Sequence, residues 1–171
     1  MTTPIAPNTG PFPSTRLGLE VLDEKCLLSY QDGNKQLSVL EFQIGIDTLA
    51  QQIFKHTPPR PIELEQAIDL VEEAIMQVQA QVPRGLAVDS RSARLLLLQR
   101  SGSPLQAMPG ETPQLSLQQV ESLFNRLADL SQGRPAMQDD LPTGPRFAAA
   151  LLIWRELMHH LQIETVTLAA P

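Results

Sequence analysis

Residues 17–44 read LGLEVLDEKCLLSYQDGNKQLSVLEFQI, and this stretch decides the fold class. Apolar residues occupy alternate positions of 17–21, which is typical of a strand with one buried face. Polar residues at 23–25 then mark a turn, and Asp32-Gly33 favours a hairpin because glycine tolerates the positive φ of hairpin turns. The stretch therefore predicts three antiparallel strands that follow one another in a meander.

Helical and strand patterns follow the meander. The clearest helix comes after Pro61, because apolar residues recur at steps of four, three, four and three from Leu64 to Val78. Ser116 and Gln119 form a capping box, which marks the start of another helix. The expected elements are a helix around Ile46–Ile53, the helix after Pro61, a strand at Gly85–Val88, a helix at Ser92–Arg100, the helix after Ser116, a buried helix at Pro145–Leu161 and a strand at Ile163–Leu168.

This order of elements, β-β-β-α-α-β-α-α-α-β, is that of a ribonuclease-H-like domain, which actin-like ATPases contain twice. Right-handed crossovers place helices on both faces of such a sheet. The sequence therefore predicts an α/β fold with a mixed five-stranded sheet, in a single ribonuclease-H-like (actin-like ATPase) domain at residues 17–171. Four prolines among residues 1–16 predict a flexible, Pro-rich tail before it.

Composition and charge exclude several classes of partner. The chain has 171 residues and a formal net charge of −6, so it repels polyanions on average, and no Lys/Arg cluster offers a local exception. The first residues lack an apolar signal segment, and the longest apolar run, Phe147–Trp154, is too short to span a bilayer. We therefore expect a cytoplasmic protein that uses no cofactor and binds neither nucleic acid nor a membrane.

Three segments resemble the exopolyphosphatase / guanosine pentaphosphate phosphohydrolase (Ppx/GppA) family. They read FQIGIDTLAQQIFKHTPPRPIELEQAIDLVEEAI, LSLQQVESLFNRLADLS and PRFAAALLIWRELMHHLQIETVTLA. Their order and spacing agree with that family over about residues 17 to 168. The family has two actin-like lobes with phosphate chemistry in the cleft between them, and the chain resembles only the second lobe.

The resemblance also implies that the phosphate-binding loop is degenerate. The family pattern D-I-G-G-G-S-T-E falls on the eight residues that begin at Glu20. Glycines in such a loop let backbone N–H groups approach an anion closely. Here Leu22, Asp23 and Glu24 replace the three glycines, Lys25 follows them, and only Glu20 keeps the charge of its counterpart. This departure predicts that no catalytic residue survives in the loop.

A second segment supplies a candidate anion site. VDSRSAR places Ser90, Arg91 and Ser92 where a strand is expected to end and a helix to begin, and N–H groups at a helix start bind anions. Arg146 matches the arginine of the family pattern R-A-D-V-I-L-A-G. These four residues are the candidate site for a phosphate-containing small molecule. The alternative is that Asp89 or Ser90 caps the helix and binds nothing.

The remaining chemically active side chains favour structural roles. Cys26 falls within a predicted strand without a basic partner in sequence, so we expect an inert, buried thiol. Adjacent residues on a helix point about 100° apart, so His159 and His160 do not easily chelate one metal ion. Glu72 and Glu73 are expected to belong to a solvated helix face. We therefore assign no metal site from the sequence.

The leading hypothesis is a non-catalytic, exopolyphosphatase-related binding or regulatory module. Without its companion lobe the chain exposes apolar surface, which a second copy or a protein partner would cover. One alternative is a residual sensor of phosphate, polyphosphate, guanosine tetraphosphate or another nucleotide, or a phosphohydrolase that acts with a separate first lobe. Another is a structural subunit that binds a protein partner through residues 1–16.

Overall fold

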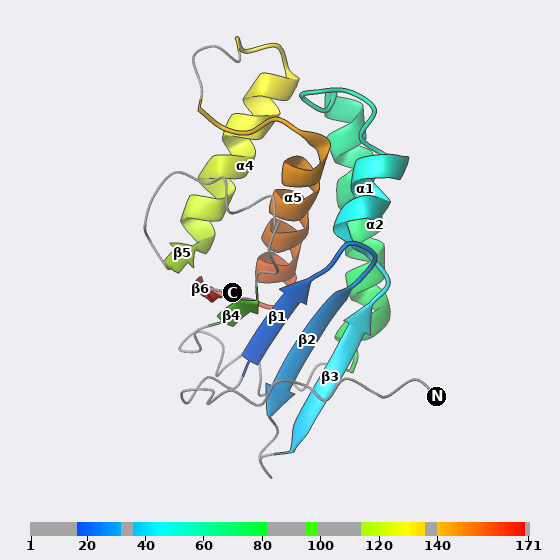
Figure 1. Cartoon of the computed structure of the whole chain (residues 1–171), viewed down its shortest axis with the longest axis vertical. Coiled ribbons are helices and arrows are strands. Elements are labelled where there is room, and N and C mark those ends of the chain that lie inside the picture. Colours follow the sequence, from blue (N-terminus) through cyan, green and yellow to red (C-terminus); the bar gives the residue numbers. More distant parts are fainter. Residues whose placement is uncertain (1–16, 32–35, 82–94, 99–113, 136–139, 170–171) are drawn as a thin grey trace, which may run out of the picture.

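A mixed six-stranded sheet and a group of four helices form the part of the chain that the structure describes (Figure 1). The computed structural model describes residues 17–31, 36–81, 95–98, 114–135 and 140–169. The elements in chain order are β1 (Leu17–Val21), β2 (Cys26–Gln31), β3 (Leu37–Phe42), α1 (Ile46–Gln52), α2 (Pro61–Gln79), β4 (Leu95–Leu98), β5 (Gln114–Ser116), α4 (Leu117–Ser131), α5 (Pro145–His160) and β6 (Thr165–Ala169).

The meander predicted from residues 17–44 is confirmed. β1 and β2 pair antiparallel up to Val21 and Cys26, and β2 and β3 pair antiparallel up to Gln31 and Leu37. β4 and β6 extend the sheet parallel to β1, and β5 pairs antiparallel with β6. The strand order is therefore β3-β2-β1-β4-β6-β5, with β3 and β5 at the two edges.

The helix predicted at Ser92–Arg100 is wrong, because Leu95–Leu98 form strand β4 between β1 and β6. A run of four leucines shows neither a helical nor an alternating period, and a parallel strand between two others is typically a continuous apolar run. β5 was missed because three residues are too few to show a period. The five-stranded count and the predicted element order are therefore not confirmed. The strand predicted at Gly85–Val88 and the tail at residues 1–16 lie outside the described residues.

Helix α5 lies at the centre of the core, as its apolar sequence predicts. It packs against α1, α2 and α4, and Figure 1 shows it between α4 on one side and α1 and α2 on the other. The three small side chains of Ala148–Ala150 are fully buried, and Trp154 is the largest buried side chain of the core. None of the helices in the described ranges combines the length and hydropathy that crossing a membrane requires.

The described helices cover one face of the meander and leave the other open. On β2, Cys26, Leu28 and Tyr30 are buried in the same core cluster as the helices. On β3 the opposite face carries Leu37 and Val39, which are 51% and 55% exposed. Helices on both faces of the sheet are therefore not confirmed within the described part of the chain.

The turn between β1 and β2 packs directly on Gly45, the residue before α1. A Cβ atom at Gly45 would lie 2.4 Å from the carbonyl oxygen of Asp23, the carbonyl carbon of Glu24 and the amide nitrogen of Lys25. These are backbone atoms, which cannot rotate away as a side chain does. The close approach therefore requires glycine, although the φ of −141° at Gly45 is one that any residue adopts.

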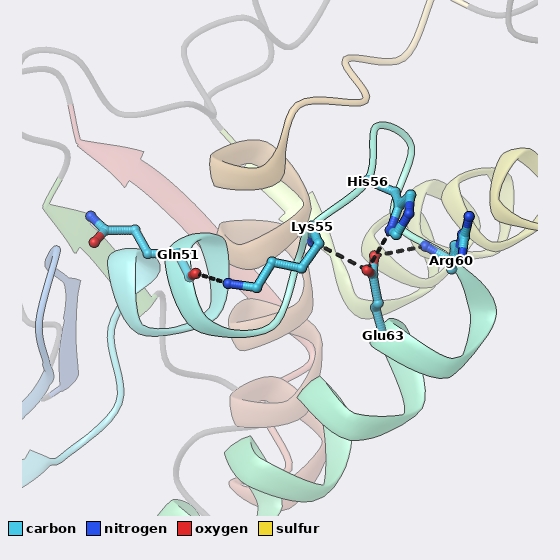
Figure 2. A network of polar contacts seen from close by, with 5 residues as sticks. All are labelled: Gln51, Lys55, His56, Arg60 and Glu63. Atoms are coloured by element: carbon cyan, nitrogen blue, oxygen red, sulfur yellow. Dashed lines mark hydrogen bonds and ion pairs between the residues drawn. The ribbon is translucent and has the colours of Figure 1, made fainter.

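A buried carboxylate fixes the connection between α1 and α2 (Figure 2). Glu63, only 6% exposed, accepts hydrogen bonds from His56 Nδ1 at 2.7 Å, the Arg60 amide at 2.9 Å and the Lys55 amide at 3.2 Å. Burial raises the pKa of Glu63, but these hydrogen bonds lower it by more, so its pKa lies below the ordinary value. The ionised carboxylate therefore holds the loop closed over the start of α2.

We predict that Glu63→Gln lowers the free energy of unfolding near pH 7 by about 1–3 kcal/mol, because hydrogen bonds to a charged group are lost. The folded-state pKa is below the unfolded value of about 4.3. The stabilisation is therefore present above pH 4.3 and is lost as the pH falls through the folded pKa. Urea unfolding of both proteins between pH 7 and pH 3 measures this. Glu65→Gln, an exposed site one turn into α2, is the control, and an equal response of the two variants would contradict the assignment.

We predict that Gly45→Ala destabilises the fold by about 1–3 kcal/mol or more, since the added methyl group overpacks a backbone contact. Gly144→Ala is the matched control, because a Cβ there meets no atom within 4 Å. Denaturant unfolding measures both variants. Equal midpoints for the two alanine variants would show that the turn does not press on Gly45.

Candidate functional site

Backbone hydrogen bonds fix the β1–β2 turn, which is the degenerate phosphate loop of the sequence analysis. Within the turn, the Leu22 amide donates to the Lys25 carbonyl at 2.9 Å. From α1, the Ile46 amide donates to the Leu22 carbonyl at 3.0 Å. The Asp47 amide likewise donates to the Asp23 carbonyl at 2.7 Å. Amides at a helix start bind anions in other proteins, but these two are bonded to carbonyl groups of the turn.

Arg146 closes over the turn from the first turn of α5. Its Nη2 lies 2.5 Å from Oδ1 of Asp23, and its Nη1 donates to Oδ1 of Asp47. The guanidinium thus links the β1–β2 turn, α1 and α5 through two carboxylates. The hydrogen bond to Asp23 raises the pKa of Arg146 above its ordinary value, so the side chain stays charged.

The ion pairs of Arg146 contribute little to the stability of the fold, and their main effect is on the charge at the turn. The side chains of Arg146, Asp23 and Asp47 are 46%, 63% and 30% exposed. At such exposure each pair contributes at most about 1 kcal/mol, because solvent screens it. Their consequence is that both terminal nitrogens of the Arg146 guanidinium already donate to carboxylates.

The described side chains around the turn carry excess negative charge. Glu24 is exposed beside Asp23, and Lys25 pairs with Glu41 on β3 at 2.7 Å. With Arg146 and Lys25 as the cations and Asp23, Glu24, Asp47 and Glu41 as the acids, the formal sum is 2 − 4 = −2. These described side chains together therefore repel a phosphate group that approaches the turn.

The structure joins two of the sequence-predicted residues and adds one that sequence reasoning missed. Asp23 of the loop and Arg146 of the anion site lie in contact. Asp47 was missed, although an acid in the first turn of a helix is a recognisable signal. Nothing in the spacing connected it to an arginine 99 residues away.

Glu20 and Cys26 lie outside the group formed by Asp23, Asp47 and Arg146. Glu20 lies on β1, opposite Leu27 of β2, and not in the turn. Cys26 is fully buried and its thiol donates to the Ile44 carbonyl at 3.1 Å. Burial raises the pKa of Cys26, which keeps the thiol protonated and inert. The three residues predicted at the second segment, Ser90, Arg91 and Ser92, lie outside the described residues.

Solved structures share the fold of this chain, whereas no family model and no curated protein matches its sequence significantly. An exopolyphosphatase-like protein superposes with a TM-score of 0.67 at 12% identity, over 95% of this chain and 56% of that one. The PPX-GPPA enzyme of Aquifex aeolicus superposes with a TM-score of 0.60 at 14% identity, over 90% and 52%. An exopolyphosphatase from Cytophaga hutchinsonii superposes with a TM-score of 0.60 at 13% identity, over 91% and 53%.

The chain spans little more than half the length of these structures. Identities of 12–14% show the fold and carry no substrate or activity to this chain. The resemblance inferred from the sequence segments is nevertheless confirmed at the level of fold. The chain therefore has the fold of about half of a Ppx/GppA-type exopolyphosphatase.

Proposed function

We propose that this chain is a non-catalytic binding module built on the second lobe of an exopolyphosphatase-like scaffold. The observation that carries the proposal is the position of Arg146 between Asp23 and Asp47. In this arrangement the guanidinium donates its hydrogen bonds to the protein's own carboxylates, and an incoming phosphate would need those same donors. The module therefore does not bind phosphate at the loop that resembles the family's phosphate loop.

Backbone chemistry supports the same proposal. A phosphate loop presents unpaired N–H groups to its ligand. Here the amides of Leu22, Ile46 and Asp47 donate to carbonyl oxygens at 2.7–3.0 Å. Gly45 holds the turn against α1 so closely that the two segments leave no space for a phosphoryl group between them. Binding phosphate through these three amides requires breaking their hydrogen bonds.

The open face of the meander supports a role in protein association. Leu37 and Val39 are more than half exposed on β3, and Leu27 of β2 is half-buried on the same face. β3 is an edge strand, so its outer backbone groups are open to pairing with another strand. Apolar side chains on an edge strand favour association with a second copy. We therefore propose that the module self-associates through β3.

We predict that five phosphate compounds leave the melting temperature of the wild-type chain unchanged. They are phosphate, pyrophosphate, polyphosphate, ATP and guanosine tetraphosphate. A ligand at 100 times its Kd adds about 2.7 kcal/mol of stability, which such a measurement resolves readily. Saturable stabilisation by polyphosphate that Arg146→Ala or Arg91→Ala abolishes would support the residual sensor or enzyme instead.

We predict that removing the carboxylates beside Arg146 creates a phosphate site. Asp23→Asn combined with Asp47→Asn removes two negative charges and frees Arg146, so pyrophosphate is expected to stabilise this variant in the same assay. Asp140→Asn is the control, because Asp140 pairs with Arg126 at 2.5 Å outside the turn. If pyrophosphate stabilises the double variant no more than the control, the ion pairs of Arg146 with Asp23 and Asp47 are not what excludes phosphate.

The association prediction is tested by size-exclusion chromatography with light scattering. The wild-type chain is expected to form a dimer, and Val39→Lys is expected to shift it to a monomer because a charge replaces an apolar contact. Ile62→Lys on α2 is the matched control, since Ile62 is also 55% exposed. A monomeric wild type at the highest soluble concentration, or equal loss of the dimer in both variants, would contradict association through β3.

A further inference from the structure

Three side chains with metal-binding chemistry meet between α2 and α5, outside the turn described above. Glu72 lies on α2, and Glu156 and His160 lie on α5. One ligand atom from each residue lies within 4.8 Å of the other two. The group combines an imidazole nitrogen with two carboxylate oxygens and draws on two packed helices, so it is not a surface patch of acids.

The spacing of the three residues suits one ion. Residues four apart on a helix project from the same side, which places Glu156 and His160 together. Nε2 of His160 lies 3.6 Å from Oε1 of Glu72, which is too long for a hydrogen bond. Ligands held at 2.0–2.2 Å around a tetrahedral ion are roughly 3.3–3.6 Å apart, by the geometry of such sites. The two groups are therefore already separated as ligands of one ion are.

Charge at this point favours a cation. Glu156 is 3% exposed, and a carboxylate that is so buried needs a positive partner. Arg155 supplies one through its Nη1, while its guanidinium also lies 4.6 Å from the ring centroid of Phe124. Glu72 brings a second carboxylate to the same place. With His160 neutral, as a metal ligand must be, Glu72 and Glu156 give the group a formal charge of −2, and Arg155 beside it reduces the local sum to −1. A divalent ion would offset this remaining negative charge.

The site is open to solvent on the α2 side. Glu72 also lines a shallow surface hollow. Among the described residues, Asp69, Glu73, Met76 and Gln77 line it as well. Of these five described side chains three are acidic and none is basic, so this part of the lining favours cations over anions. A hydrated ion therefore has a route to Glu72 and can keep water at the positions the protein leaves open.

We propose that Glu72, Glu156 and His160 bind a divalent transition-metal ion of the zinc class between α2 and α5. Imidazole and carboxylate ligands together suit Zn²⁺ and Co²⁺ better than Mg²⁺ or Ca²⁺, which prefer oxygen alone. The bound ion links two helices that pack together in the core, so it stabilises the fold. This inference is independent of the function proposed for the β1–β2 turn.

The neighbouring histidine shows why the sequence did not reveal this group. His159 and His160 diverge as expected for adjacent helical residues, and His159 pairs with Glu121 on α4. His160 faces the other way, toward Glu72. The relevant sequence pattern was therefore Glu156 and His160, four residues apart on one helix. The third residue, Glu72, lies 84 positions before Glu156. That partner is brought in by helix packing alone.

The experiment uses the full chain stripped of metal with EDTA and then titrated with Zn²⁺ and with Co²⁺. We expect elemental analysis after dialysis to find one Zn²⁺ per chain. We expect bound Co²⁺ to show the visible absorption bands of a site with a low coordination number. Zn²⁺ is also expected to raise the melting temperature. His160→Ala and Glu72→Gln are expected to weaken binding tenfold or more and to abolish the melting shift. Both residues are partly exposed, so these variants are expected to fold.

His159→Ala and Glu65→Gln are the matched controls, because His159 neighbours a proposed ligand and Glu65 is an exposed carboxylate on the same helix as Glu72, but both lie outside the group and the hollow. Both are expected to bind Zn²⁺ as the wild type does. The proposal is overturned if the wild type binds no Zn²⁺ after dialysis, or if His160→Ala binds as tightly as His159→Ala.

Discussion

The close packing of the β1–β2 turn on Gly45 is the constraint on which the rest of the account depends. It forces the turn against the start of α1, where the amides of Ile46 and Asp47 become donors to turn carbonyls. The same contact positions Asp23 and Asp47 on either side of Arg146. Packing and backbone hydrogen bonds supply the stability of this arrangement, while the exposed ion pairs mainly determine its charge. The turn that the sequence resemblance aligns with a phosphate loop is held against α1 by this packing and these hydrogen bonds.

Much of the fold was predictable, because the deciding signals are local. Alternation and the Asp32-Gly33 pair identified the meander, and the four-and-three spacing after Pro61 identified α2. The failures were at Leu95–Leu98 and at β5, where the chain segments are short and their conformation is set by neighbouring strands. Propensity and period cannot decide such segments, since their hydrogen-bond partners lie far away in sequence.

At the β1–β2 turn, the unusual residues could be recognised in the sequence, but their contacts could not. The resemblance places Leu22, Asp23 and Glu24 where the family pattern has glycines, and this could be seen in the sequence. The partner of Asp23 is Arg146, 123 residues later, and only the approach of α5 to the turn brings them together. The group formed by Glu72, Glu156 and His160 illustrates the same limit, because each residue alone has an ordinary structural explanation. Residue types indicate possible chemistry, and tertiary packing decides which of them meet.

The most direct test of the central claim is a crystal structure of the chain soaked in short-chain polyphosphate. The account predicts that Arg146 stays bonded to Asp23 and Asp47 and that the turn keeps its hydrogen bonds to α1. A phosphoryl group held by the main-chain amides of the turn, with Arg146 turned away from both carboxylates to bind it, would contradict the account.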